Sequence, residues 1–175
     1  MAFKRWAFAS CSWLVLLTVL VVVLTAGFKW RNTEMQHYAG EQHVAPLDGQ
    51  WCGYKPTDVD DLFAKLGADG RKFYAKSEIY LDIVFPFTYG ALLIMLAWRF
   101  SRPPWRSIVV VLAALTVAAD LTENGLISYL AFTYSDQVQP LAEVANLATL
   151  TKWYLLAAAV VGLGVGALVK LCKPR

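Results

Sequence analysis

Four stretches of the chain are long and apolar enough to cross a lipid bilayer as helices. We predict spans at 6–28, 79–98, 107–132 and 141–171, because a membrane-crossing helix needs about 20 mostly apolar residues. The first contains the run "WLVLLTVLVVVL". This pattern predicts an all-α fold, a four-helix transmembrane bundle that forms a single integral membrane domain over residues 1–175.

The first apolar stretch has two interpretations. Lys4 and Arg5 precede it and the small residues "TAG" occur at 25–27, as in a cleaved signal peptide. The apolar run is longer than the roughly 7–15 residues usual for such a peptide. We therefore expect a retained helix, with cleavage as the alternative.

The segment at 29–76 is predicted to be a long extracytoplasmic loop. Its first half, "RNTEMQHYAGEQHVAPLDGQWCGYKP", is polar and rich in turn residues, so we expect irregular structure there. Its second half begins with Thr57, a plausible helix N-cap. Apolar residues then recur on one helical face, at Val59, Leu62, Phe63 and Leu66. We predict a short amphipathic helix at the outer membrane surface, followed by a second helix that starts near Arg71.

Basic residues are distributed unevenly between the two sides of these predicted spans. If the N-terminus is cytoplasmic, eight basic residues and no acidic residue flank the cytoplasmic ends, namely Lys4, Arg5, Arg99, Arg102, Arg106, Lys170, Lys173 and Arg175. The short connection "TYSDQVQP" on the other side carries an acidic residue and no basic one. The positive-inside rule then predicts that both termini are cytoplasmic. We expect a plasma membrane protein, in a bacterium an inner-membrane protein.

The composition supports a membrane protein and excludes several other classes. The 175 residues are 58% hydrophobic and only 17% charged. The 16 basic residues are dispersed, so we expect no nucleic-acid partner. The three cysteines, Cys11, Cys52 and Cys172, lie far apart and form no zinc-binding pattern.

Ionisable residues occur within the predicted spans at a common depth. Asp82, Asp120, Glu123 and Lys152 lie about 13 to 18 residues from the cytoplasmic ends of their helices, which corresponds to roughly 20–27 Å of helical rise. The hydrocarbon core is about 30 Å thick. Three helices therefore place charged side chains in one layer, toward the outer side of the membrane.

Other polar residues share helical faces with these four. Asn124 lies on the stripe of Asp120 and Glu123 because i, i+3 and i+4 positions are neighbours on a helix. By the same spacing, Lys152 is joined by Thr149 and Asn146, and Asp82 by Glu78, Pro86 and Tyr89. Pro86 has no N–H to donate to the carbonyl of Asp82, which predicts a kink and a free carbonyl there.

This predicted polar cluster has a structural and a functional interpretation. In the structural one, Lys152 pairs with carboxylates and the cluster stabilises the bundle through modest interhelical hydrogen bonds. In the functional one, the three carboxylates Asp82, Asp120 and Glu123 carry more negative charge than Lys152 alone can neutralise. A low-dielectric site then needs protons or a cationic ligand to compensate the remainder. Intramembrane ionisable residues favour the second interpretation.

We favour a non-enzymatic function, the binding of a lipid or small molecule or an accessory role in a membrane complex. An intramembrane enzyme acting on an amphiphile through Asp82, Asp120 and Glu123 is the alternative. A cation- or proton-coupled carrier is a third possibility.

We expect neither a metal ion nor another cofactor. The only histidines, His37 and His43, fall outside the predicted spans. This argues against haem and against the histidine-rich zinc sites of membrane hydrolases.

Small residues recur at Ala158, Gly162 and Gly166, on one face of the last predicted helix. Such a ridge permits close helix packing, either within the bundle or against a partner. Membrane lipids, a membrane protein or a second copy of the chain are the partners that we expect.

The strings "LGADGRKFY", "LDIVFPFTYG", "DLTENG" and "TLTKW" resemble those of small bacterial multi-pass membrane proteins that have no assigned activity. The strings lie between Leu66 and Trp153. The resemblance implies the same class of membrane protein and adds no activity.

Overall fold

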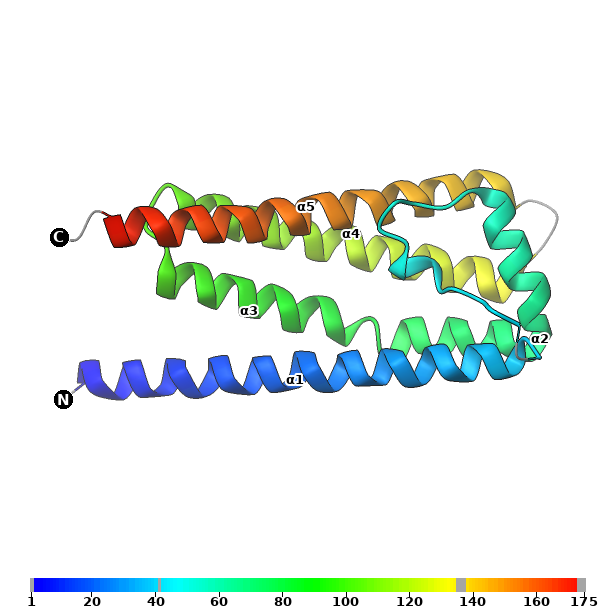
Figure 1. Ribbon diagram of the computed structural model, residues 1–175, viewed down its shortest axis with the longest axis horizontal. Coiled ribbons are helices and arrows are strands. Elements are labelled where there is room, and N and C mark those ends of the chain that lie inside the picture. Colours follow the sequence, from blue (N-terminus) through cyan, green and yellow to red (C-terminus); the bar gives the residue numbers. More distant parts are fainter. Residues whose placement is uncertain (1, 41, 135–137, 173–175) are drawn as a thin grey trace.

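The computed structural model describes residues 2–40, 42–134 and 138–172, with side chains placed from Ser12 onward except at 138 and 139. The described chain is helical apart from its connections (Figure 1). The helices are α1 (Ala2–Tyr38), α2 (Pro56–Tyr80), α3 (Val84–Phe100), α4 (Trp105–Thr133) and α5 (Val138–Cys172), with a short 3₁₀ helix η1 (Leu47–Gly49).

Four segments are long and apolar enough to cross a membrane, which confirms the predicted number of spans. They are Ser12–Tyr38, the α2–α3 segment Pro56–Phe100, Trp105–Thr133 and Pro140–Cys172. Part of the predicted connection at 133–140, and the basic residues Lys173 and Arg175, lie outside the described residues.

The long helices run along one axis, and the start of α1 lies at the same end of the molecule as the end of α5 (Figure 1). Helices α4 and α5 form the most extensive helix pair, and α3 packs against α4. Helix α1 packs against α2 and α3. Much of its apolar surface is exposed, including Trp13, Leu16 and Val22, as expected for a helix that faces lipid.

Helix α1 continues past the predicted boundary at Phe28 to Tyr38. The prediction of irregular structure from Arg31 onward was therefore wrong for residues 31–38. Arg31 and Met35 are buried on the continuation, which packs against α2. Tertiary packing stabilises these additional helical turns, although their sequence is too polar to be recognised as part of a span.

Helix α2 begins at Pro56, with Lys55 rather than Thr57 at the N-cap position. Proline suits the first helical turn because its missing N–H has no partner there in any case. Gly67 has a φ of 64°, a left-handed conformation that glycine tolerates, and it kinks the helix. The second part therefore resumes directly after Gly67 rather than near Arg71.

The first part of α2 covers the end of the bundle that is distant from the chain termini (Figure 1). Its predicted apolar face is fully packed, because Val59, Leu62, Phe63 and Leu66 are all buried. The Phe63 ring meets the Tyr134 ring edge-on, with 5.6 Å between centroids. The apolar face of this segment is thus covered by the rest of the chain, and its position at the membrane surface remains a prediction.

The small-residue ridge on α5 is used within the bundle. A Cβ atom at Gly162 would lie 3.3 Å from Val109, and one at Gly166 would lie 2.9 Å from the Cβ of Trp105. Both glycines are buried, whereas Ala158 is exposed. The two glycines permit close packing of α5 on α4 and the α3–α4 turn, and a partner on the side of Ala158 remains a prediction.

Candidate functional site

Two nearly buried basic residues organise the polar interior of the bundle. Arg31 on α1 is 1% exposed and Lys152 on α5 is 7% exposed. Five carboxylates from η1, α2, α4 and the break between α2 and α3 surround them, namely Asp48, Glu78, Asp82, Asp120 and Glu123. We call these seven residues the charged cluster. It carries three more acidic than basic side chains.

Arg31 holds one group of three carboxylates. Its Nη1 donates to Glu78 Oε1 at 2.9 Å and lies 3.5 Å from Asp82 Oδ2. Its Nη2 lies 3.0 Å from both carboxylate oxygens of Asp48. The guanidinium also lies over the Phe28 ring, 4.9 Å from its centroid. A planar fork of donors suits this arrangement, which a lysine could not reproduce.

Asp48 connects the two basic residues. Its carboxylate accepts from Arg31, and its backbone carbonyl lies 3.3 Å from both Lys152 Nζ and Trp153 Nε1. Tyr74 adds a contact of 3.3 Å to the Asp48 carboxylate. Burial alone would raise the pKa of Asp48, but the charges of Arg31 and Lys152 outweigh it and hold the pKa below its ordinary value.

Lys152 holds the second group of carboxylates. Its ammonium forms a close ion pair with Glu123 and lies 3.4 Å from Asp120 Oδ1. The hydroxyl of Thr149 donates to Glu123 at 2.5 Å, and the hydroxyl of Tyr89 donates to Asp120 at 2.8 Å. Three helices, α3, α4 and α5, therefore meet through this group.

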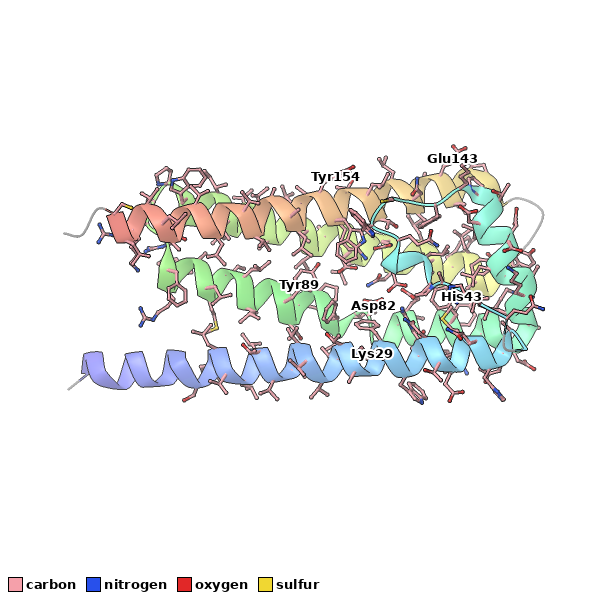
Figure 2. All side chains as sticks on the ribbon, viewed as in Figure 1. Lys29, His43, Asp82, Tyr89, Glu143 and Tyr154 are labelled. Carbon is pink, nitrogen blue, oxygen red and sulfur yellow. The ribbon has the colours of Figure 1, made fainter. Side chains whose placement is uncertain are left out.

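The break between α2 and α3 belongs to the same site. Figure 2 shows Asp82 at this break and Tyr89 farther along α3. The side-chain amide of Asn124 donates to the backbone carbonyl of Asp82 at 2.7 Å. The predicted kink and free carbonyl at this position are thus confirmed, because Asn124 supplies the donor that Pro86 lacks.

The structure brings most of the predicted site residues together. Asp82, Asp120, Glu123, Lys152, Thr149, Glu78, Asn124 and Tyr89 all take part in the contacts above. Asn146 is the exception, because its side-chain oxygen accepts from the backbone N–H of Tyr54 at 2.8 Å and anchors the loop before α2.

Sequence reasoning missed Arg31 and Asp48. Both fall in the stretch that was predicted to be irregular, and neither has the depth signal that identified the other residues. One signal was present for Arg31, because residues 28, 31 and 35 would share a face if the first helix continued. No sequence pattern identified Asp48, because it lies in a short 3₁₀ turn whose position over the bundle depends on tertiary contacts.

The five carboxylates are not equally well compensated. Glu78, Asp48 and Glu123 each have a basic partner within 3.0 Å. The basic partners of Asp82 and Asp120 lie farther away, at 3.5 and 3.4 Å. Asp82 and Asp120 are therefore the carboxylates whose basic partners lie farthest away.

A cavity of about 210 Å³ adjoins these two carboxylates. It lies between α1 and α5, with α3, α4 and η1 contributing to its walls. Its accessible wall is mostly apolar and includes Phe28, Phe85, Tyr89 and Trp153, while the charged residues Arg31, Asp48, Asp82, Asp120 and Lys152 border it. Aromatic rings beside carboxylates suit a cation.

Three carboxylates also have the spacing of a metal site. Oxygen atoms of Asp48, Glu78 and Asp82 lie within 4.8 Å of one another. The guanidinium of Arg31 contacts all three, however, and already supplies the positive charge that a metal ion would bring. A divalent ion there would have to displace Arg31, so this donor set does not fit a resident metal.

Comparisons of the chain with models of protein families, with curated proteins and with solved structures give no significant match. The chemistry of the side chains is therefore the basis for a functional inference.

Proposed function

We propose that this membrane protein binds an amphiphile with a positively charged head group, in the cavity between α1 and α5. The head group, an ammonium, would pair with Asp82 and Asp120. The apolar tail would leave the cavity between the two helices and lie along the exposed apolar surface of the bundle.

The observation that carries this proposal is the incomplete compensation of Asp82 and Asp120 at the cavity wall. Both carboxylates are nearly buried, at 3% and 2% exposure. A buried carboxylate is costly unless it is protonated or paired with a cation. A ligand ammonium would supply the charge that Arg31 and Lys152, occupied by closer partners, provide only at longer range.

The aromatic walls support a cation of moderate size. Rings of Phe28, Phe85, Tyr89 and Trp153 line the cavity, and aromatic faces attract ammonium groups. Since a water molecule takes up about 30 Å³ of the liquid, the cavity has room for a head group of a few non-hydrogen atoms. In this proposal the alkyl chain of the amphiphile lies outside the cavity.

Mass spectrometry of compounds that co-purify with the protein tests this proposal. We expect the wild type to retain amine-bearing amphiphiles, and Asp82→Asn and Asp120→Asn to lose them, because each removes one of the weakly compensated charges. Glu143→Gln on α5 (Figure 2) is a matched control, since this exposed carboxylate is not one of the residues that line the cavity.

Calorimetric titration with a defined probe complements this experiment. Dodecylammonium should bind to the wild type more tightly than dodecanol, which has the same chain and no charge. Equal binding of both, or undiminished dodecylammonium binding by the Asp82→Asn, Asp120→Asn double variant, would contradict the proposal. A chemically altered amphiphile in the co-purified fraction would instead support the enzymatic alternative.

A further inference from the structure

Four basic residues gather at the opposite end of the bundle from the first part of α2. Arg99 lies near the end of α3, Arg102 in the α3–α4 turn, Arg106 at the start of α4 and Lys170 near the end of α5. We call them the terminal basic cluster. The charge of Lys170 is close enough to be repelled by those of all three arginines. The fold thus concentrates positive charge from three helices.

Backbone contacts hold two of these side chains in place. Lys170 Nζ donates to the carbonyl of Arg99 at 2.6 Å, and Arg106 Nη2 donates to the carbonyl of Ser101 at 3.0 Å. The Arg106 guanidinium also lies over the Trp98 ring, 4.4 Å from its centroid. The basic groups are therefore fixed near one another instead of dispersing into solvent.

The neighbouring sequence contains no acidic side chain to offset this charge. Neither Asp nor Glu occurs at 83–119 or at 144–175. Among the described residues, no carboxylate pairs with Arg99, Arg106 or Lys170, so an external anion would compensate their charge.

We propose that the terminal basic cluster binds the phosphate group of an anionic phospholipid. Guanidinium and ammonium groups form their strongest hydrogen bonds with such oxyanions. Trp98 and Phe100 are exposed beside the cluster, at 61% and 45%, and exposed aromatic rings favour the level of lipid head groups. This setting favours a phospholipid over a free ion. The site is separate from the cavity of the proposed function.

Native mass spectrometry of the purified full-length protein tests this site. The protein is titrated with phosphatidylglycerol and with phosphatidylcholine of identical chains. We expect the wild type to prefer the anionic lipid. Lys170→Gln and Arg106→Gln should each reduce this preference by about fivefold, the value for one basic group near an anionic surface, and Arg106→Lys should retain most of it.

Lys65→Gln provides the matched control. Lys65 lies on α2 and pairs with Asp61 at 2.6 Å, so its loss should leave the lipid preference unchanged. Lys170→Gln is decisive if Arg106→Gln fails to fold, because Lys170 lies at the surface of α5. An unchanged preference in folded Lys170→Gln, or equal binding of the two lipids by the wild type, would overturn the proposal.

A second arm distinguishes a lipid from free phosphate. Phosphatidylglycerol binding is measured in sodium phosphate and in sodium chloride of equal ionic strength. Equal binding in both supports the phospholipid. Loss of binding in phosphate alone would assign the site to the inorganic ion and overturn the lipid assignment.

Discussion

Arg31 is the counter-ion of three carboxylates, Asp48, Glu78 and Asp82. It comes from α1, while its partners come from η1, α2 and the break before α3. Removing one member of a buried ion network leaves the opposite charges uncompensated, which costs more than the pair itself contributes. We therefore infer that Arg31 fastens α1 and η1 to the rest of the bundle.

Substitution of Arg31 tests this role. We expect Arg31→Met to lower the free energy of unfolding by about 3–5 kcal/mol, measured by denaturation in detergent. Arg31→Lys should recover only part of the loss, because an ammonium cannot reach three carboxylates with a planar fork. Lys29→Met, an exposed neighbour on α1, should have little effect. Equal stability of Arg31→Met and the wild type would rule out a fastening role.

The depressed pKa of Asp48 predicts a dependence of stability on pH. Asp48 stabilises the fold only while it is ionised, so its contribution is complete above its ordinary pKa of 3.8 and is lost as the pH falls through the lower folded-state value. We expect the difference in Tm between the wild type and Asp48→Asn to be constant from pH 5 to 7, because this whole range lies above the ordinary pKa of 3.8.

Below about pH 4 the same difference should shrink, because Asp48 then becomes protonated in the unfolded wild type and, at lower pH, in the folded one. Thermal unfolding in detergent over this range measures the effect. Asp69→Asn serves as a control, since this side chain is 85% exposed and has Lys72 as its ion-pair partner. A difference that stays constant down to pH 2 would contradict an ionised, paired Asp48.

At the scale of elements, the break between α2 and α3 depends on Pro86 and Asn124 together. Proline cannot donate to the Asp82 carbonyl four residues earlier, and Asn124 on α4 donates to it instead. The local sequence thus creates an unsatisfied acceptor and a neighbouring helix satisfies it. This exchange positions Asp82 at the wall of the cavity.

A double-mutant cycle measures this dependence. We expect Asn124→Ala to destabilise the wild type by about 1–3 kcal/mol, because the buried Asp82 carbonyl loses its donor. In a Pro86→Ala background the cost should be smaller by about 1 kcal/mol, since the new N–H can reach that carbonyl. Thr122→Ala, an exposed position on α4, is the control. The same cost in both backgrounds would show that the two residues act independently.

At the scale of the whole molecule, charge divides the bundle into two ends. The first part of α2 covers one end, and the elements that carry the terminal basic cluster, the α3–α4 turn and the end of α5, lie at the other (Figure 1). The placement of the basic end in the cytoplasm stays a prediction.

Cysteine labelling tests this orientation, because Cys52, in the connection before α2, and Cys172, the last residue of α5, are both exposed. In intact cells, a membrane-impermeant maleimide should label a variant that retains only Cys52. A variant that retains only Cys172 should react with the maleimide only after the cells have been permeabilised. The reverse pattern would show that the termini are extracytoplasmic.

The predicted part of the site follows from local rules. The helical rise fixed the depth of Asp82, Asp120, Glu123 and Lys152, and helical spacing identified Thr149 as a neighbour of Lys152. These rules apply within a continuous apolar helix, where the sequence pattern specifies both the boundaries and the register.

Arg31 and Asp48 could not be predicted in this way. The end of α1 is helical because Met35 and Arg31 pack against other elements, and the position of η1 depends on contacts with α2 and α5. Such stabilisation comes from residues that are distant in sequence, so a local sequence pattern cannot predict it.

The sequence by itself therefore determined the number of apolar helices long enough to span a membrane, and it predicted a common layer for their charges, because bilayer thickness and helix geometry act on each segment separately. Only the tertiary structure decided how those charges pair. It brought Arg31 and Asp48 to the cluster and left Asp82 and Asp120 as its weakly compensated members, because the partners of a buried charge depend on how the helices pack.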